Sequence, residues 1–112
     1  MSRSPKLRRP PAPSLLFAAL GDETRLALVG KLCSGEPHSI AELTAGSRLT
    51  RQAITKHLRV LAKAEIVRCS RSGRETRFEL EPDSIVQMRS FLDAVSRQWD
   101  ETLDRLKLFV EE

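Results

Sequence analysis

The chain has 112 residues, of which 40% are hydrophobic, and its formal net charge is +4. This length suits one domain with a modest core, and no apolar run is long enough to cross a bilayer. Prolines interrupt the basic N-terminus where a signal peptide needs an apolar stretch. The two cysteines, Cys33 and Cys69, have no short spacing between them. We therefore expect a cytoplasmic protein without a disulfide framework.

The positive charge is unevenly distributed along the chain. Residues 1–13 carry +4, residues 14–46 carry −2, residues 47–80 carry +6 and residues 81–112 carry −4. A central basic block suits a phosphate-binding surface better than it suits general solubility. Residues 1–13 also contain four of the six prolines. This composition predicts a disordered basic arm, which is either a solvated tail or a further phosphate contact.

Short helices are expected through the first half of the chain. Residues 14–20 are apolar and end near Gly21, and Asp22 can cap a second helix that runs to about Ser34. The sequence SIAE at residues 39–42 fits a capping box that begins a short helix ending at about Ala45. The next helix begins after a tight turn. Two short helices joined in this way predict a helix-turn-helix.

The helix expected at residues 50–63 has one apolar side and one basic side. Thr50 is a plausible N-cap, and Ile54, Leu58 and Leu61 lie on one face. Residues 50–64 contain no Asp or Glu, so ion pairs one turn apart cannot neutralise the other face. That face is either simply solvated or binds an anionic partner. Its side chains are Arg51, Gln52, Thr55, Lys56, Arg59 and Lys63.

A basic hairpin is expected at about residues 66–80. The stretches IVRCS and TRFEL alternate with a period of two, and Ser72 and Gly73 supply turn chemistry between them. A helix-turn-helix followed by such a hairpin is a winged helix. The helix at residues 50–63 and this hairpin are adjacent and both basic on their free sides. This coincidence favours a surface that binds an anionic partner over a merely solvated one. The hairpin arginines are Arg68, Arg71, Arg74 and Arg77.

From about Pro82 onward the pattern predicts one long amphipathic helix of roughly 45 Å. So small a domain cannot cover a helix of that length alone, so we expect the free face to bury a second copy of the chain. The alternatives are a helix that folds back over its own core and a helix that docks on a different protein. The expected dimer contacts are Leu15, Leu16, Phe17, Ile85, Met88, Leu92, Val95, Trp99 and Leu106.

Four stretches together resemble the ArsR/SmtB family of small winged-helix transcriptional regulators. They are LGDETRLALVGKL, SIAEL, TRQAITKHLRVLAKAEIV and SGRETRFEL. The resemblance implies a mainly α fold with a small β-hairpin: a winged helix-turn-helix domain at residues 14–81 and a C-terminal dimerisation helix at residues 82–112. It also implies a homodimer that binds operator DNA, usually represses transcription and releases DNA when an effector binds.

The sequence departs from that family in its metal ligands. Metal-sensing members carry paired cysteines before the recognition helix, or His and carboxylate ligands on the last helix. Here the first segment reads SIAELTAG, and residues 82–112 contain no histidine. The chain therefore resembles the family's metal-independent branch, and we expect no metal and no cofactor, with an unknown effector. A second departure is Arg48, which stands in the turn where a glycine with positive φ is often found.

The sequence also predicts the environments of His57 and of the two cysteines. His57 lies beside the buried stripe, so a hydrogen-bonded structural histidine is preferred over a phosphate contact, with a metal ligand third. Cys33 is expected to be a core thiol, and Cys69 is expected on the inner side of the wing.

The sequence thus predicts a homodimeric repressor that reads an inverted repeat with half-sites about 34 Å apart. A non-specific architectural DNA-binding protein is the alternative. An enzyme is not expected, because no nucleophile-base pair, carboxylate dyad or phosphate loop is apparent. The expected DNA contacts are Thr50, Arg51, Gln52, Thr55, Lys56, His57, Arg59, Arg71 and Arg74.

Overall fold

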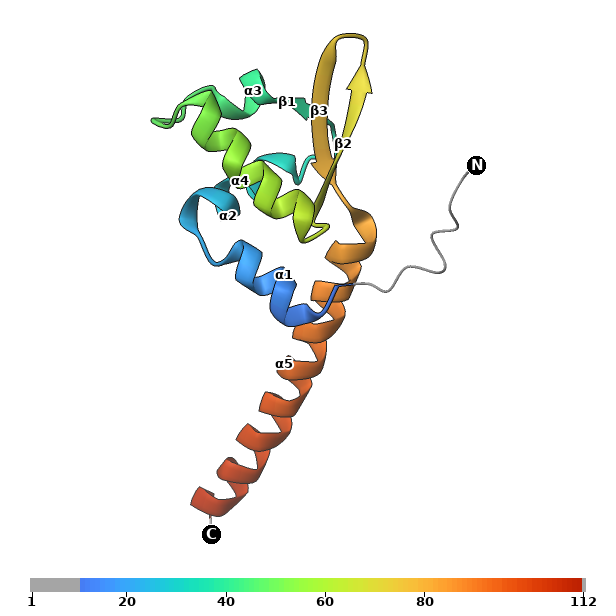
Figure 1. Cartoon of the computed structure of the whole chain (residues 1–112). Coiled ribbons are helices and arrows are strands. Elements are labelled where there is room, and N and C mark those ends of the chain that lie inside the picture. The colour runs from blue at the N-terminus through green and yellow to red at the C-terminus, as the bar shows by residue number, and fades with distance from the viewer. Residues whose placement is uncertain (1–10, 112) are drawn as a thin grey trace, which may run out of the picture.

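The computed structural model describes residues 11–111, so most of the predicted basic arm lies outside the described residues. Within residues 11–111, five helices and three short strands build the fold, which confirms a mainly α winged helix-turn-helix with a long C-terminal helix (Figure 1). In chain order the elements are α1 (Pro13–Leu20), α2 (Glu23–Leu32), β1 (His38–Ser39), α3 (Ile40–Thr44), α4 (Arg51–Lys63), β2 (Val67–Ser72), β3 (Glu75–Leu80) and α5 (Pro82–Glu111).

Side-chain caps fix where three of the helices begin. Asp22 accepts a hydrogen bond from the Arg25 amide at 3.0 Å, and Thr50 accepts one from the amide of residue 53 at 3.1 Å. Ser39 and Glu42 form a complete capping box at the start of α3. Each cap satisfies an amide that the first turn of a helix leaves without a partner. The three capping predictions are therefore confirmed.

The core lies where the helix-turn-helix meets the sheet and the start of α5. The apolar stripe of α4 is buried, with Ile54, Leu58 and Leu61 each no more than 1% exposed. This burial confirms the face that the spacing of the stripe predicted. The remaining buried apolar residues are Leu16, Ala19, Leu28, Leu32, Leu43, Ile66, Val67, Phe78 and Met88.

The wing hairpin belongs to a three-stranded antiparallel sheet with the order β1-β3-β2. Strands β2 and β3 pair with Ser72 opposite Glu75, which leaves a two-residue turn whose first residue, Gly73, has a φ of +64°. The pairing of β1 with β3, His38 opposite Phe78, was not expected from the sequence. A strand of two residues has too few positions to display an alternating pattern.

Arg48 does not adopt a positive φ, so its departure from the glycine often found in this turn causes no backbone strain. Among the described residues, the only non-glycine with a positive φ is Glu65, at 61°, directly after the C-cap of α4. The turn between α3 and α4 instead places its positive φ, 78°, at Gly46. The carbonyl of Glu65 accepts a hydrogen bond from the Ser84 hydroxyl, which links the end of α4 to the start of α5.

This left-handed position gives a stability prediction. Valine at position 65 should destabilise the fold by about 1–2 kcal/mol relative to glycine, because a β-branched side chain is strongly disfavoured at positive φ. Comparing Glu65→Val with Glu65→Gly removes the carboxylate from both proteins, so their difference reports the backbone. Urea unfolding of the two variants measures it. Equal free energies of unfolding would show that φ is not positive at this position.

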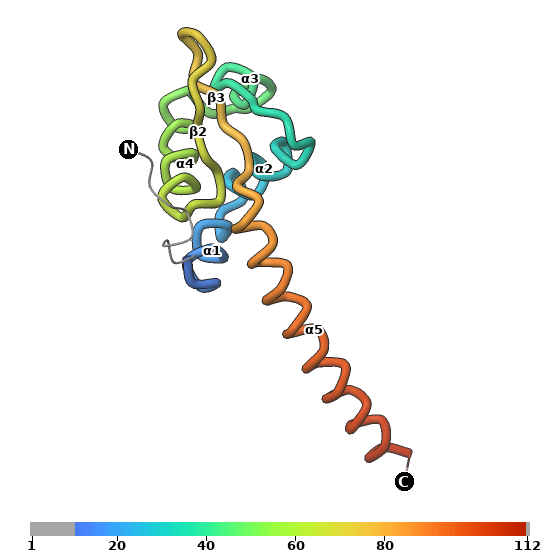
Figure 2. The backbone as a smooth tube through the Cα atoms, turned by 90° about the vertical axis from the view of Figure 1, so that its right-hand side faces the viewer, coloured from blue at the N-terminus to red at the C-terminus, as the bar shows by residue number. Residues whose placement is uncertain are grey.

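Helix α5 leaves the body of the molecule and extends well beyond it (Figure 2). The helix has 30 residues, and its buried side chains, Ser84 and Met88, both lie in its first two turns. The overall extents of 67 × 41 × 21 Å reflect this projection. The helix does not fold back over its own domain, which removes one of the sequence alternatives. No helix among residues 11–111 is long and apolar enough to span a membrane.

Candidate DNA-binding interface

The outward face of α4 is basic and unpaired. Arg51, Gln52, Lys56 and Arg59 are exposed. None of these four side chains makes a hydrogen bond or ion pair within residues 11–111. Together with residues 40, 50, 53 and 55 they line an open depression along the start of the helix. Because the core holds the opposite face of α4, these side chains point to solvent and can contact an anionic partner.

The two threonines of this face have part of their hydrogen-bonding capacity in use. The Thr50 hydroxyl accepts from the amide of residue 53, and the Thr55 hydroxyl donates to the Arg51 carbonyl at 2.7 Å. A hydroxyl that already donates can only accept further hydrogen bonds. Thr55 can therefore accept from an exocyclic amine of a base or contact a thymine methyl with its own methyl group, but it has no free proton for a base acceptor.

His57 faces α2 and not the open side of α4. Its Nδ1 lies 3.2 Å from a terminal nitrogen of Arg25 and 3.8 Å from an Asp22 oxygen. The imidazole therefore lies beside a guanidinium and a carboxylate of the chain's own fold. The preferred interpretation of a structural histidine is confirmed. A DNA contact by His57 stays a prediction, because the side chain is 24% exposed and only one ring nitrogen contacts Arg25 and Asp22.

The wing arginines fall into two groups. Arg68 lies 2.9 Å from Glu79 and 3.5 Å from Glu81, and Arg77 lies 2.8 Å from Glu75. In contrast, Arg71 and Arg74 are exposed and make no ion pair within the part of the chain that the structure describes. The wing therefore offers two unpaired guanidinium groups: Arg74 is the second residue of the turn that begins at Gly73, and Arg71 lies on β2 close to it. These are the two arginines that the sequence assigned to DNA.

Both basic elements reach the same end of the molecule. In Figure 1 the start of α4 and the tip of the hairpin point away from the free end of α5. The two elements are held in one body, since α4 packs directly against β2. Such an arrangement can place a helix in a groove of duplex DNA while the hairpin reaches the neighbouring backbone.

Two capping carboxylates carry lowered pKa values. The Arg25 amide holds the pKa of Asp22 below its ordinary value of 3.8, and the nearby His57 and Arg25 side chains act in the same direction. The Ser39 amide does the same for the pKa of Glu42, ordinarily 4.5, with help from Arg77. A lowered folded-state pKa adds stability above the unfolded-state pKa, and this stability is lost as pH falls through the folded value.

Acid should therefore destabilise the protein through these caps, in a window that begins near the ordinary values of 3.8 and 4.5 and extends below them. Asparagine and glutamine keep an oxygen acceptor but do not titrate. Between about pH 6 and about pH 2, thermal midpoints of the Asp22→Asn/Glu42→Gln double variant should fall less than those of the wild type. Parallel curves for the two proteins would contradict the prediction.

Both cysteine expectations are wrong, because Cys33 and Cys69 are exposed. Cys33 follows Leu32, so it stands about 100° around the helix from that fully buried residue. In β2, an edge strand of the sheet, only Val67 is buried, and Cys69 is exposed although it pairs with the core residue Phe78. Within residues 11–111, no three His, Cys, Asp or Glu side chains gather as a metal site.

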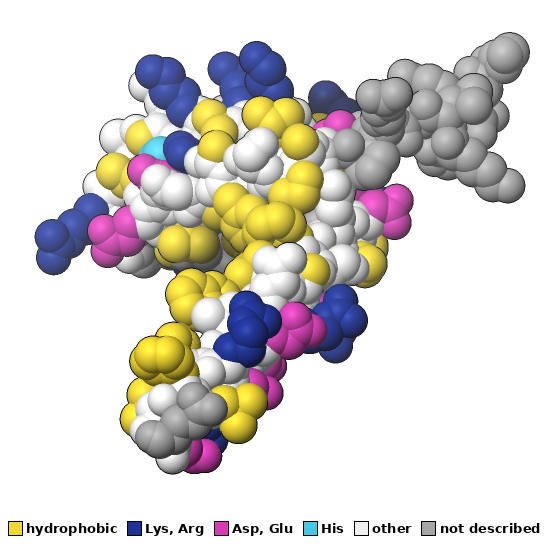
Figure 3. Space-filling model, turned by 90° about the horizontal axis from the view of Figure 1, so that it is seen from below, with side chains coloured by type: hydrophobic (Ala, Val, Ile, Leu, Met, Phe, Trp, Pro, Cys, Tyr) yellow, Lys and Arg dark blue, Asp and Glu magenta, His cyan; other side chains and the backbone are white. Residues whose placement is uncertain are grey.

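A second surface, at the opposite end, is apolar. Five side chains of α5 share one face and are each 52–80% exposed, and we call them the α5 stripe: Leu92, Trp99, Leu103, Leu106 and Val110. Seen from below in Figure 3, apolar side chains cover the underside of the body and continue along α5. Leu15, 60% exposed, also belongs to the apolar side chains on the surface.

Not every residue expected at a dimer contact is available on this surface. Leu16 is 0% exposed and Met88 is 7% exposed, so both belong to the chain's own core. Neither side chain exposes enough surface for a second copy of the chain to cover. The prediction that Leu16 and Met88 are dimer contacts is therefore corrected. The reason is that α1 packs directly against the start of α5, where Phe17 also stacks near Phe91 with ring centroids 5.6 Å apart.

Comparisons with known proteins agree with this architecture. A family model described as a helix-turn-helix domain matches residues 20–70. The HTH-type transcriptional regulator Rv2034 of Mycobacterium tuberculosis is 34% identical over 93 residues, which cover 82% of each chain.

Solved structures give the same answer. An ArsR-like transcriptional regulator from Rhodococcus sp. RHA1 is 30% identical, covers 87% of this chain and 91% of its own, and has a TM-score of 0.71. A winged helix-turn-helix DNA-binding domain from Mycobacterium bovis, described as homodimeric, shares the fold with a TM-score of 0.61 at 12% identity over 79% of this chain and 82% of its own. With its winged helix, unpaired basic face and similarity to these regulators, the chain belongs to the ArsR family of helix-turn-helix transcriptional regulators.

Proposed function

We propose that this regulator is a homodimeric repressor that recognises an inverted repeat. The observation that carries the proposal is the presence of two surfaces at opposite ends of one chain. One end presents the unpaired basic side chains of α4 and of the wing tip. The other end presents the α5 stripe. A two-fold pair of chains joined through the stripe places two α4 helices on one duplex, about one helical turn apart.

The dimer part of the proposal rests on exposed apolar area. Trp99 is 60% exposed and Leu106 is 54% exposed on a helix that projects past its own domain. Apolar patches of this kind mark interaction surfaces in soluble proteins. A second copy of the same helix is the partner we propose, because a homodimer buries both stripes at once and yields the two-fold symmetry that an inverted repeat requires. The homodimeric description of the Mycobacterium bovis domain is consistent with this choice.

The DNA part assigns a role to each side chain by its position. Arg51 and Gln52, in the first turn of α4, are placed to reach base edges, with Arg toward guanine and Gln toward adenine. Lys56 and Arg59 lie farther along the helix and contact phosphates, as do Arg71 and Arg74 of the wing. Repression follows when the bound dimer excludes other proteins from the same DNA.

Selection from a genomic pool tests the proposal. The protein is mixed with fragmented genomic DNA, the retained fragments are sequenced, and affinities for the best fragment and for random DNA are measured at one salt concentration. We expect a recurring inverted repeat and a specificity ratio of about 10³ or more. Retained fragments without a shared sequence, and similar affinities for all DNA, would instead identify a non-specific architectural protein.

A further inference from the structure

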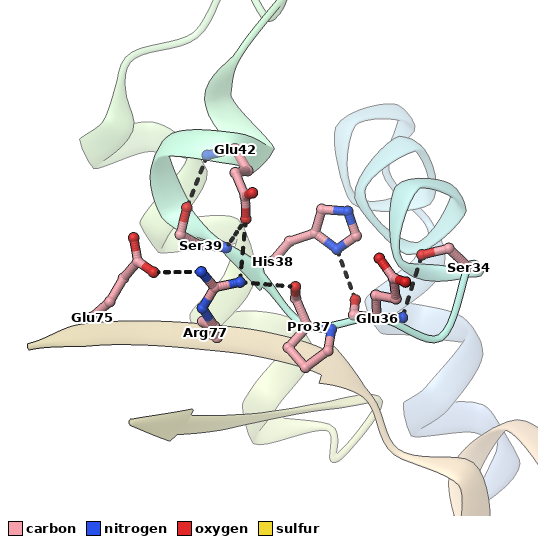
Figure 4. A network of polar contacts seen from close by, with 8 residues as sticks. All are labelled: Ser34, Glu36, Pro37, His38, Ser39, Glu42, Glu75 and Arg77. Carbon is pink, nitrogen blue, oxygen red and sulfur yellow. Dashed lines mark hydrogen bonds and ion pairs between the residues drawn. The ribbon is translucent and has the colours of Figure 1, made fainter. Parts of the chain in front are cut away.

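Arg77 differs from the other wing arginines in what its guanidinium touches. In Figure 4 the side chain lies among acceptors from three separate segments of the chain. One nitrogen lies 2.8 Å from Glu75 of its own strand. The other lies 3.7 Å from Glu42 of α3 and 3.4 Å from the carbonyl of Pro37, which precedes β1. No other wing arginine is paired with a helix of the helix-turn-helix within residues 11–111.

The partner on α3 is itself fixed. Glu42 accepts a hydrogen bond from the Ser39 amide at 2.8 Å as part of the capping box, and that amide belongs to the residue that pairs with Arg77 across the sheet. The planar fork of an arginine can hold two carboxylates in a defined geometry, which a flexible ammonium cannot do. Arg77 therefore joins β3, the central strand of the sheet, to the N-terminus of α3.

Arg77 lies between the body of the molecule and the free tip of the hairpin. Register places Arg77 opposite Ser70, one pair below Arg71 and Thr76, on the side of the hairpin nearest the body. Beyond it the wing has no buried side chain, so packing does not fix the angle of its tip. The contacts of Arg77 are the last polar tie to the helix-turn-helix before the free tip that carries Arg71 and Arg74.

We propose that Arg77 is a positioning residue for DNA binding and not a phosphate contact. This inference rests on the proposed role of the wing. By tying β3 to α3, Arg77 holds the wing tip at the angle at which Arg71 and Arg74 reach the backbone while α4 occupies the groove. Its effect on DNA affinity therefore passes through those two arginines.

Four proteins test this dependence: the wild type, Arg77→Gln, Arg71→Ala/Arg74→Ala, and the combination of all three substitutions. Their dissociation constants for the selected operator are measured at one salt concentration. Arg77→Gln alone should weaken binding about threefold to tenfold. In the background that lacks the two tip arginines it should have almost no further effect, since nothing remains to position. An equal loss in both backgrounds would identify a direct phosphate contact and overturn the inference, as would the absence of any loss.

Arg68→Gln is the matched control. Arg68 also pairs with two carboxylates, but these belong to Glu79 of the hairpin and to Glu81, which directly follows it, and neither lies on α3. Arg68→Gln should therefore change the affinity for the operator less than Arg77→Gln does. Arg77→Lys retains the charge without the fork, so it should remain impaired if the geometry matters and bind normally if only the charge does. Unchanged thermal midpoints confirm that each variant is folded.

A measurement without DNA separates this inference from the proposed function. Backbone NMR order parameters of residues 71–76 should fall in Arg77→Gln and stay near wild-type values in Arg68→Gln. Unchanged values in Arg77→Gln would overturn the tie between wing and α3 even if the protein binds an operator. Conversely, a wild type that prefers no sequence would reject the proposed function, while a loosened wing would still show that the tie exists.

Discussion

Replacement of Trp99 by alanine is expected to weaken the dimer by about 2 kcal/mol or more, which corresponds to a roughly 30-fold higher dissociation constant. Trp99 is the largest side chain of the α5 stripe and is 60% exposed in the single chain. An indole in the middle of an interface buries a large apolar area and packs against its neighbours. Sedimentation equilibrium of the wild type and the variant at several concentrations measures the change.

The opposite side of the same helix supplies the control. Leu108 is 67% exposed and stands about 180° around α5 from Trp99, so Leu108→Ala removes exposed apolar area from outside the stripe. It should leave the dissociation constant of the dimer nearly unchanged. A wild-type protein that sediments as a monomer at micromolar concentration would reject the homodimer altogether. Equal effects of the two substitutions would show that the partner does not bind the stripe.

Replacement of Gln52 by alanine is expected to cost about 1 to 3 kcal/mol on the operator, because it removes a potential contact to a base edge. Affinity for random DNA should remain nearly unchanged, and base preference should relax at one pair in each half-site. The two subunits of a dimer double the effect on the operator. Gln98→Ala, the same substitution at an exposed position of α5, should leave both affinities unchanged.

Replacement of Arg71 should have a different signature. Arg71→Ala removes a guanidinium that binds phosphate, so it should weaken operator and random DNA alike and reduce the slope of log K against log salt by about one unit for each phosphate that is no longer neutralised. Arg97→Ala on α5 controls for the loss of a charge elsewhere. If Gln52→Ala instead lowered both affinities equally, the basic face of α4 would act only as an electrostatic grip, and the architectural interpretation would gain.

Local signals in the sequence were sufficient for the helices and their caps. Asp22, Ser39 and Thr50 each cap the helix that directly follows them, as their positions predict, since a cap depends on atoms only two or three residues away. The buried face of α4 was equally predictable, because a helix repeats its contacts every 3 to 4 residues, about one turn. The resemblance to a known family led to the same fold, and the comparisons confirm it.

The burial of individual side chains was less predictable. The character of their neighbours predicts buried positions for Cys33 and Cys69, yet both are exposed. Their exposure depends on where α2 ends and on the place of β2 at the edge of the sheet, and neither is a local property. Leu16 shows the converse case, because the packing of α1 on α5 covers a side chain that the sequence suggested would be free.

The sequence by itself determined the order of the helices and of the hairpin strands, the helix caps and the concentration of positive charge in residues 47–80, because each of these depends on near neighbours or on composition. Only the tertiary structure decided which basic side chains are paired within the chain and which remain free to bind a partner. Four arginines in the wing look alike in sequence, but contacts with Glu79 and Glu81 occupy Arg68, and contacts with Glu75 and Glu42 occupy Arg77. The pairing of Arg77 with Glu42 joins residues 35 positions apart, and only the folding of β3 beside α3 brings them together.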